Sequence, residues 1–541
     1  MNLEILAQVI RPIAVTGSLD RDVTAICYDS RRATEGCIFV ALPGVKTDGN
    51  EFIDAAVAKG AVAVVSEKPG LATRATHLQV REARPALADL AATFFRNPSH
   101  HLKIAGVTGT NGKTTTAFII KHLCDTALQR CGLIGTVRYV VGDRELPASR
   151  TTPESADVHE LLWMMRSAGC KSCAMEVSSH ALMLDRVRGV EFDVAVFTNL
   201  TQDHLDFHQT MDAYFDAKAR LFEGLPKQTK KVGRAVINLD DRFGARLVDR
   251  LGRSMEFFTY GQGVHAQFRA SNVRMDFSGT TYALDALGRS YLVKMPLIGA
   301  FNVYNSLAAL AAAHVMGVPM RTAVQALATL PPVPGRMQAV AAKKPFRVFV
   351  DYAHTDDALI NAMKTLRELE PGRLITVFGC GGNRDRAKRP KMAAAVDALA
   401  DYAIVTSDNP RKEDPLAIIE DIKPGFRRLT PEIIVDRKEA IYKAIAMAQP
   451  RDIILLAGKG HEAYQEFADS TIPFDDAAIA ASALGERRET VSRPHPRRPR
   501  NEPGEGGPQG RGPRPGGRGG PQDREGRERP GRERGDDEAF E

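Results

Sequence analysis

Short apolar runs alternate with longer stretches of mixed polarity through most of the chain. In its middle part, the runs that predict buried strands lie at residues 103–107, 172–177, 193–198 and 234–238. Alternation of strands with helical stretches predicts a mostly parallel sheet wrapped by helices. Between Phe268 and Pro296 the runs become short and alternating, so we expect an antiparallel extension there, followed by a helix at residues 301–316.

The same alternation starts again after Pro334 and Gly335. The strands expected in this part lie at residues 346–351, 373–378, 402–406 and 452–456. A smaller α/β unit, with apolar runs at residues 37–42 and 61–65, precedes the Asn97-Pro-Ser99 turn signal. The pattern therefore predicts an α/β protein with three domains, at residues 1–98, 99–333 and 334–490.

From Ser492 onward, Arg, Gly, Pro and Glu dominate and apolar residues are almost absent. Such a segment cannot bury enough surface to offset its chain entropy, so we expect residues 491–541 to be a disordered Arg/Gly/Pro-rich tail. Arg-Gly segments can bind RNA through its phosphates. A solubilising or tethering role is favoured over nucleic-acid binding, because acids largely balance the arginines of the tail and the tail has no Phe, Tyr or Trp before Phe540.

The composition and the cysteine content indicate the cellular compartment in which the protein is expected. Its 541 residues carry a formal net charge of only +7, and no apolar run approaches the length of about 18 residues that a membrane helix needs. Residues 1–20 lack the features of a signal peptide, and the seven cysteines are too scattered for a disulfide framework. The Cys170–Cys173 pair suggests zinc or redox chemistry only weakly, and packing is favoured. We expect a cytoplasmic protein without membrane insertion, and a monomer.

A glycine-rich segment between the first predicted strand and helix of the middle domain carries the strongest chemical signal. It reads Gly106-Val-Thr-Gly-Thr-Asn-Gly-Lys-Thr-Thr-Thr116. Glycines let backbone N–H groups cradle a polyphosphate at the positive end of the next helix. Lys113 would neutralise the β- and γ-phosphates, and the Thr114 hydroxyl would bind magnesium. Val107 stands where the strict Walker pattern has glycine, but the Lys-Thr pair still predicts an ATP or GTP site.

Further segments resemble the Mur ligase family in their order and spacing. They are Glu176-Val-Ser-Ser-His180, Thr198-Asn-Leu-Thr-Gln-Asp-His204, Gly299-Ala-Phe-Asn-Val-Tyr-Asn305, Gly335-Arg-Met337, Asp351-Tyr-Ala-His354, Gly379-Cys-Gly-Gly382, Ser407-Asp-Asn-Pro-Arg411 and Ala457-Gly-Lys-Gly-His-Glu462. The resemblance covers residues from about Asp29 to Gln465. It implies the three-domain Mur ligase architecture: a small UDP-muramoyl-binding domain, a central P-loop domain that binds ATP, and a Rossmann-like domain that binds the amino acid.

The resemblance also implies a reaction. An ATP-dependent ligase of this kind adds meso-2,6-diaminopimelate to UDP-N-acetylmuramoyl-L-Ala-D-Glu in cytoplasmic peptidoglycan synthesis, with Mg²⁺ as cofactor. The substrate carboxylate attacks the γ-phosphate of ATP, and the resulting acyl phosphate is then attacked by an amine, so that an amide, ADP and phosphate are formed. Because two anions must first meet, cationic screening is the main catalytic demand.

The family pattern assigns roles in the central domain. The ATP loop comprises Gly109, Thr110, Asn111, Gly112, Lys113, Thr114 and Thr115. Glu176 would hold magnesium with Thr114, and His204 would bind a second metal ion. Lys218 matches the lysine that carbon dioxide converts to N6-carboxylysine, a carboxylate able to approach magnesium. The residues matched to catalysis are thus Lys113, Glu176, His204 and Lys218.

Other matches concern the remaining parts of the substrates. Asn302 and Asn305 would share one face of a helix and read the adenine edge, while Arg336, Asp351 and His354 would lie near the phosphates and ribose of ATP. The UDP-muramoyl dipeptide would contact Ser30, Thr151, Thr152, Ser178 and Arg186, together with the loop at residues 44–48. Two positions depart from the family pattern: Asp356 replaces a proline, and Leu184 replaces a glutamine.

The choice of amino acid is predicted from the Asp408-Asn409-Pro410-Arg411 segment, which matches the form associated with diaminopimelate. The distal carboxylate of that substrate favours a planar, bidentate cation, which is arginine. Arg384, Gly458 and Glu462 match the other contacts, Glu462 being suited to the distal ammonium. This segment and the Ser30 region disfavour a folate polyglutamate or muramoyl-alanine ligase. A regulatory P-loop NTPase with an RNA-binding tail would leave the second sheet unexplained.

Overall fold

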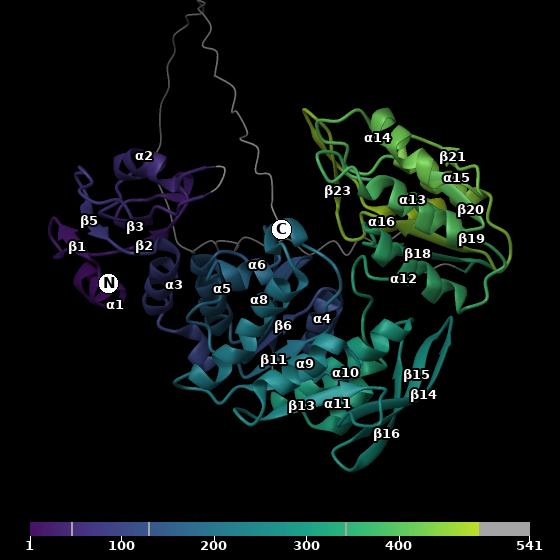
Figure 1. Ribbon diagram of the computed structural model, residues 1–541, viewed down its shortest axis with the longest axis horizontal. Coiled ribbons are helices and arrows are strands. Elements are labelled where there is room, and N and C mark those ends of the chain that lie inside the picture. Colours follow the sequence, from purple (N-terminus) through teal and green to yellow (C-terminus); the bar gives the residue numbers. More distant parts are fainter. Residues whose placement is uncertain (45–46, 128–129, 341–342, 486–541) are drawn as a thin grey trace, which may run out of the picture. The chain divides into compact units, whose positions relative to one another are not determined.

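The computed structural model describes residues 1–44, 47–127, 130–340 and 343–485. The predicted tail at residues 491–541 lies outside these residues, as does part of the loop at residues 44–48. Among the described residues, the strands form three main sheets in consecutive segments of the chain, as the hydrophobic pattern predicts (Figure 1). None of the helices in these segments is long and apolar enough to cross a membrane.

The first sheet has the strand order β1-β5-β4-β3-β2. Its elements are α1 (Leu3–Ile10), β1 (Ala14–Thr16), β2 (Ala25–Cys27), β3 (Cys37–Val40), α2 (Ile53–Ala58), β4 (Ala63–Ser66), β5 (Thr76–Gln79) and α3 (Ala83–Phe94). Only β1 runs antiparallel to its neighbour. Ile38 and Phe39 are both fully buried, in the clusters on opposite faces of the sheet. Burial on both faces explains the continuous apolar runs in this segment.

The second sheet has the order β16-β15-β14-β13-β12-β11-β6-β10-β7-β8-β9. Its strands are β6 (Lys103–Thr108), β7 (Cys131–Ile134), β8 (Arg138–Val141), β9 (Arg144–Pro147), β10 (Ser172–Glu176), β11 (Val194–Phe197), β12 (Arg234–Asn238), β13 (Phe257–Gly261), β14 (Phe268–Asp276), β15 (Gly279–Ala286) and β16 (Arg289–Met295). The pairings from β7 to β13 through the centre of the sheet are parallel. Figure 1 shows β14, β15 and β16 as the expected antiparallel extension.

The helices of this segment are α4 (Lys113–Thr126), α5 (Ser155–Ser167), α6 (Ser179–Met183), α7 (Leu205–His208), α8 (Met211–Gly224), α9 (Arg242–Leu251), α10 (Ala300–Val315) and α11 (Met320–Leu327). β6 lies between β10 and β11. The carboxyl ends of these three parallel strands therefore bring their following loops to one edge of the sheet, which is where α/β proteins bind ligands.

The third sheet has the order β17-β18-β22-β19-β20-β21. Its elements are β17 (Gln338–Val340), β18 (Arg347–Asp351), α12 (Asp356–Arg367), β19 (Leu374–Phe378), α13 (Lys388–Leu399), β20 (Tyr402–Val405), α14 (Pro415–Ile422), β21 (Glu432–Ile433), α15 (Arg437–Ala446), β22 (Ile453–Ala457) and α16 (Asp476–Ala483), with a separate hairpin of β23 (Tyr464–Glu466) and β24 (Thr471–Pro473). All its pairings except that of β17 are parallel.

Asp356, which replaces a proline of the family pattern, is the first residue of α12. The Thr355 side chain caps this helix by accepting a hydrogen bond from the Ala358 N–H (3.3 Å). Proline is favoured at the first helical position, and an acidic residue there is stabilised by the helix dipole. The same helix start is therefore compatible with either residue.

A fully buried ion pair joins α15 to α16. Both side chains of Arg437 and Asp476 are 0% exposed, and Arg437 donates two hydrogen bonds to the Asp476 carboxylate (2.9 and 2.7 Å). We expect Asp476→Ala to lower the free energy of unfolding by about 3–5 kcal/mol, because it leaves a buried guanidinium uncompensated. Urea unfolding followed by circular dichroism measures the change. Glu420→Ala, which breaks an exposed pair with Lys423, should cost less than about 1 kcal/mol; equal costs would contradict the expectation.

Candidate functional site

The glycine-rich loop between β6 and α4 has the backbone that its sequence predicts. Gly109 and Gly112 have positive φ angles, of 147° and 87°. A Cβ atom at Gly109 would lie 1.9 Å from the Thr198 hydroxyl, and one at Gly112 would lie 2.3 Å from the side-chain amide oxygen of Asn305. Because α4 begins at Lys113, the loop sits at a helix N-terminus, where N–H groups and the helix dipole favour an anion.

Two lysines meet at this loop. Lys113 donates hydrogen bonds to the carbonyls of Gly109 (3.1 Å) and Thr110 (2.9 Å). Lys218, on α8, is 1% exposed, donates to the same Gly109 carbonyl (2.9 Å) and lies 4.5 Å from the centre of the Tyr214 ring. Burial and the Lys113 charge hold the pKa of Lys218 well below its usual value. Its amine is therefore more available as a nucleophile than that of a surface lysine.

Glu176 ends β10 beside the loop and is 1% exposed. One of its carboxylate oxygens accepts from the Thr114 hydroxyl (2.9 Å), and the other accepts from the Thr136 N–H (2.8 Å). Burial raises the pKa of Glu176, while the charge of Lys113 opposes that rise. A buried carboxylate next to a hydroxyl and a phosphate-binding loop is a donor set that suits Mg²⁺.

His204 follows β11 and is half-buried, with a left-handed backbone (φ 51°). Its ring lies 5.0 Å from that of His180 and 6.1 Å from that of Tyr214, the residue that also packs on Lys218. In the part of the chain that the structure describes, no three His, Cys, Asp or Glu side chains are grouped closely enough to hold a metal ion. The role of His204 as a metal ligand therefore stays a prediction.

The structure brings together four of the residues matched to the UDP-muramoyl dipeptide. The Thr152 hydroxyl donates to the Glu176 carbonyl (2.9 Å) and accepts from the Ser178 N–H (3.1 Å). Arg186 donates to the Thr152 carbonyl (3.1 Å). The Thr151 hydroxyl lies 2.9 Å from that of Thr136, which also contacts Glu176. Ser30 lies in a different segment, the Ser30–Arg32 turn.

Glu154 was missed by the sequence analysis, although it orients this group. Its carboxylate is 6% exposed and accepts from Arg84 (3.1 Å), Arg150 (3.0 Å) and Arg186 (3.1 Å). The partners Arg84 and Arg186 are distant from it in sequence, so no local motif pointed to Glu154. Leu184 directly follows α6 as its C-cap residue and supplies no polar side chain where the family pattern has glutamine.

The residues matched to adenine lie at the start of α10. Asn302 and Asn305 share one face, as their spacing predicts: the side-chain amide of Asn305 donates to the side-chain oxygen of Asn302 (2.9 Å). Both are buried, and the Thr116 hydroxyl donates to Asn305 (3.4 Å). Asn305 thus packs on the phosphate loop, and recognition of the base by this pair stays a prediction.

Arg336 also reaches the phosphate loop, where it donates to the Thr114 hydroxyl (3.2 Å) while stacking 4.9 Å from the centre of the Tyr352 ring. Asp351 ends β18 and accepts from the Met337 N–H (2.7 Å). His354 lies two residues from Tyr352 and contacts its carbonyl oxygen (2.8 Å). The three residues expected near the phosphates and ribose are therefore arranged around Tyr352 and the Arg336–Met337 turn.

A second polar cluster lies at the carboxyl ends of β20 and β22. Asn409 is 2% exposed; its side-chain amide donates to Glu462 (2.8 Å), and its side-chain oxygen accepts from Lys459 (2.9 Å). A Cβ atom at Gly458 would lie 2.7 Å from the Asp408 carboxylate, so glycine permits their close approach. Burial and the Asp408 charge raise the pKa of Glu462.

Arg411 follows Pro410 in this cluster and has a left-handed backbone (φ 51°). Its guanidinium donates to the Glu466 carboxylate (2.9 Å) and to the Gly382 carbonyl (2.9 Å). Arg384 lies exposed on the neighbouring turn. Two residues of this cluster, Lys459 and Glu466, were not predicted from the sequence as site residues. The signal for Lys459 was its place in the Ala457–Glu462 segment.

Family models match three consecutive parts of the chain. The model described as Mur ligase family, catalytic domain, matches residues 22–95. The Mur ligase middle domain matches residues 107–313, and the Mur ligase glutamate ligase domain matches residues 335–460. Together these matches include strands of all three sheets, with β1 and the first part of β6 outside them.

Curated relatives are similar over nearly the whole chain. The UDP-N-acetylmuramoyl-L-alanyl-D-glutamate--2,6-diaminopimelate ligase of Solibacter usitatus is 47% identical over 491 residues, which are 90% of this chain and 98% of the relative. The protein of the same name from Geobacillus kaustophilus is 45% identical over 473 residues, covering 86% and 96% of the two chains.

Solved structures agree with the sequence matches. A structure of a UDP-N-acetylmuramoyl-L-alanyl-D-glutamate--2,6-diaminopimelate ligase has a TM-score of 0.66 and 35% identity, covering 90% of this chain and 99% of its own. A MurF structure from Acinetobacter baumannii, at 19% identity and a TM-score of 0.62, shares the fold. It covers 90% of this chain and 99% of its own.

Proposed function

This chain belongs to the Mur ligase family of ATP-dependent, amide-forming ligases, and we propose that it adds meso-2,6-diaminopimelate to UDP-N-acetylmuramoyl-L-Ala-D-Glu. The observation that carries the choice of amino acid is the cluster of Arg411, Asn409 and Glu462. It offers an arginine for a carboxylate and a carboxylate for an ammonium, and diaminopimelate carries both groups at its distal end.

The chain's own residues supply the screening that the first step needs. Lys113, at the N-terminus of α4, binds the β- and γ-phosphates, and Arg336 adds a second cation beside the same loop. Their positive charge lets the D-glutamate carboxylate approach the γ-phosphate. Attack forms an acyl phosphate and releases ADP. The amine of diaminopimelate then attacks the acyl carbon, its proton is lost, and phosphate leaves as the amide forms.

Magnesium fits the donors beside the phosphate loop. Thr114 and Glu176 would hold one ion, with the Thr114 hydroxyl 2.9 Å from the Glu176 carboxylate, and His204 would bind a second. The bound ions would neutralise charge on the transferring phosphoryl group. Lys218, as N6-carboxylysine, would add an oxygen ligand; its burial and lowered pKa support this modification, because only a neutral amine attacks carbon dioxide.

The remaining assignments complete the proposal. Residues 1–98 bind the UDP-muramoyl part with Ser30, residues 99–333 bind ATP, and residues 334–490 bind the amino acid. Thr151, Thr152, Ser178 and Arg186, gathered near Glu176, hold the dipeptide. Asn302 and Asn305 read adenine, while Asp351 and His354 contact the ATP ribose and phosphates. The reaction takes place in the cytoplasm as a step of peptidoglycan precursor synthesis, and the enzyme acts as a monomer.

A single assay tests this function. Purified protein with ATP, magnesium and UDP-N-acetylmuramoyl-L-Ala-D-Glu should release phosphate rapidly only when meso-diaminopimelate is added, and mass spectrometry should detect the tripeptide conjugate. L-Lysine should support little turnover, because it lacks the distal carboxylate that Arg411 binds. Equal phosphate release with and without any amino acid would instead support a regulatory NTPase, and preferential use of lysine would refute the assignment of the substrate.

A further inference from the structure

Two turns of the third sheet lie against each other at the ends of neighbouring parallel strands. The turn after β19 carries Arg384, and the turn after β20 carries Arg411. The Gly382 N–H donates to the Asn409 carbonyl (2.9 Å), and Arg411 donates to the Gly382 carbonyl (2.9 Å). The relative position of the two arginines therefore depends on how these turns are joined.

Glu413 is bonded to the backbone of the first turn. Its carboxylate accepts from the Asn383 N–H (2.5 Å), and the Asn383 side chain accepts from the Lys412 N–H (3.0 Å). Asn383 and Arg411 both have left-handed backbones, with φ angles of 53° and 51°. Such conformations are uncommon for residues other than glycine and persist where surrounding contacts hold them. Glu413 is one of those contacts.

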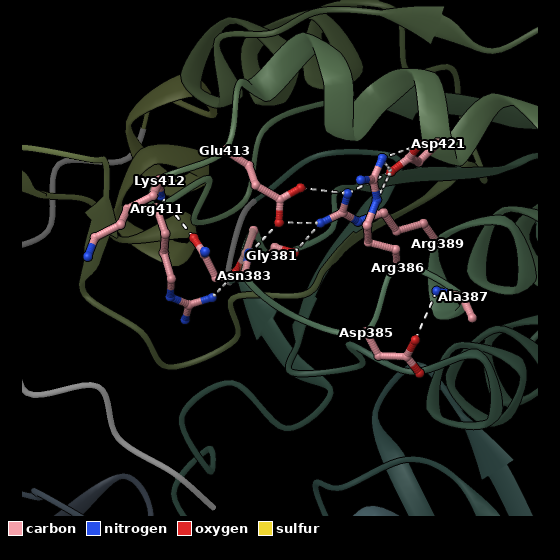
Figure 2. A network of polar contacts seen from close by, with 11 residues as sticks. Gly381, Asn383, Asp385, Arg386, Ala387, Arg389, Arg411, Lys412, Glu413 and Asp421 are labelled. Atoms are coloured by element: carbon pink, nitrogen blue, oxygen red, sulfur yellow. Dashed lines mark hydrogen bonds and ion pairs between the residues drawn. The ribbon is translucent and has the colours of Figure 1, made fainter. Parts of the chain in front are cut away.

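Arg389, on α13, fixes the orientation of the Glu413 carboxylate. It is 1% exposed and donates one hydrogen bond to each Glu413 oxygen (2.9 Å both). It also donates to the Asp421 carboxylate (2.7 Å) and to the Gly381 carbonyl in the first turn (3.3 Å). Figure 2 shows the Arg389 guanidinium between Glu413 and Asp421, with Asn383 and Arg411 on the Glu413 side. A buried fork of this kind fixes angle as well as distance.

We propose that Arg389 and Glu413 are positioning residues that set Arg384 and Arg411 for the distal carboxylate of the amino-acid substrate. This inference rests on the proposed function. Neither residue needs to touch the substrate: the Glu413 carboxylate, two residues after Arg411, holds the Asn383 N–H just before Arg384. Arg389 in turn holds Glu413. The pair thereby affects the affinity for the amino acid and leaves the phosphate loop, which belongs to another sheet, unchanged.

Glu413→Gln tests the proposal. An amide has one acceptor oxygen, whereas the Glu413 carboxylate uses both, toward Arg389 and the Asn383 N–H. We expect the KM for diaminopimelate to rise about 10- to 100-fold, as displacements of about 1 Å at a binding group do. The KM values for ATP and the UDP-linked dipeptide should stay within about twofold and kcat within about threefold, because the other sites are untouched.

Asp421→Asn is the matched control. Asp421 pairs with the side chains of Arg389 and Arg386 and, unlike Glu413, is not bonded to the backbone of either turn. The KM of this variant for diaminopimelate should therefore stay within about twofold of the parent value. Arg389→Lys keeps the charge and loses the fork. Arg389→Lys should raise the KM for diaminopimelate as Glu413→Gln does. A parent-like KM in the Arg389→Lys variant would overturn the role of the fork.

The outcomes separate this inference from the proposed function. A parent protein without diaminopimelate-dependent turnover would overturn both. An active parent whose Glu413→Gln variant keeps its KM for diaminopimelate would overturn the inference alone, and so would equal rises in all three KM values, which indicate general loosening. Thermal melting of each variant accompanies the kinetics; if Arg389→Lys fails to fold, Glu413→Gln and Asp421→Asn decide the question.

Discussion

Lys218→Ala is expected to lower kcat by at least about 100-fold, the usual cost of removing one electrostatic group from a catalytic site. Lys218 is 1% exposed, and its amine is bonded to the Gly109 carbonyl of the phosphate loop and lies close to the charge of Lys113. An unmodified cation there would repel Lys113, whereas a carbamate would supply the negative charge that a magnesium ion attracts. Steady-state phosphate release with saturating substrates measures the loss.

The matched variant Lys218→Arg distinguishes a role of the positive charge at this position from a role of the carbamate. Arginine keeps the positive charge but is not carbamylated, so it should be as inactive as alanine if the carbamate is the working form. The parent enzyme should lose activity in carbon dioxide-free buffer and regain it with bicarbonate, while neither variant should respond. NMR with ¹³C-bicarbonate should show a carbamate signal in the parent only. Turnover of Lys218→Ala within about threefold of the parent would refute the role of the carbamate.

The strands of the fold were predictable because each is a short apolar run with a local boundary. The predicted strand at residues 234–238 coincides with β12 (Arg234–Asn238), and the alternating segment before Pro296 forms β14 to β16. The order of strands was not predictable, because a buried run does not specify its neighbours. That β6 lies between β10 and β11 emerges only from packing, and this order brings Glu176 to the phosphate loop.

The same distinction applies to the site. Gly109 and Gly112 could be predicted from the sequence because they stand in one short glycine-rich motif. The structure explains why glycine is needed there: both have positive φ angles, and Thr198 and Asn305 approach them closely. Lys459 was not predicted as a site residue, although it is fully buried and hydrogen-bonded to Asn409 and Glu462. The sequence alone does not distinguish a buried, hydrogen-bonded lysine from one on the surface, and the partner Asn409 lies in another loop.

Arg411→Ala is expected to raise the KM for diaminopimelate by about 100-fold or more. The variant loses the hydrogen bonds from the guanidinium to the distal carboxylate of the substrate, and each charged hydrogen bond of this kind contributes about 1.5–3 kcal/mol. The Arg411 side chain is 16% exposed, so its interactions are only partly screened by water. KM values for ATP and the UDP-linked dipeptide should change little. Lys412→Ala removes a charge of the same sign from the next residue, and its KM for diaminopimelate should stay within about threefold of the parent value.

Arg411→Lys makes the test specific for geometry. A lysine keeps the charge but cannot bind a carboxylate through two parallel N–H groups, so its KM should stay near that of the alanine variant. Arg411→Ala should also gain no strong use of L-lysine, because removing the arginine deletes an attraction for one substrate without adding a contact for the other. In this structure Arg411 is bonded to Glu466 and Gly382, so under the proposed function an incoming carboxylate would compete with Glu466 for the guanidinium. A KM for diaminopimelate equal to that of the parent enzyme would show that the distal carboxylate is recognised by another residue.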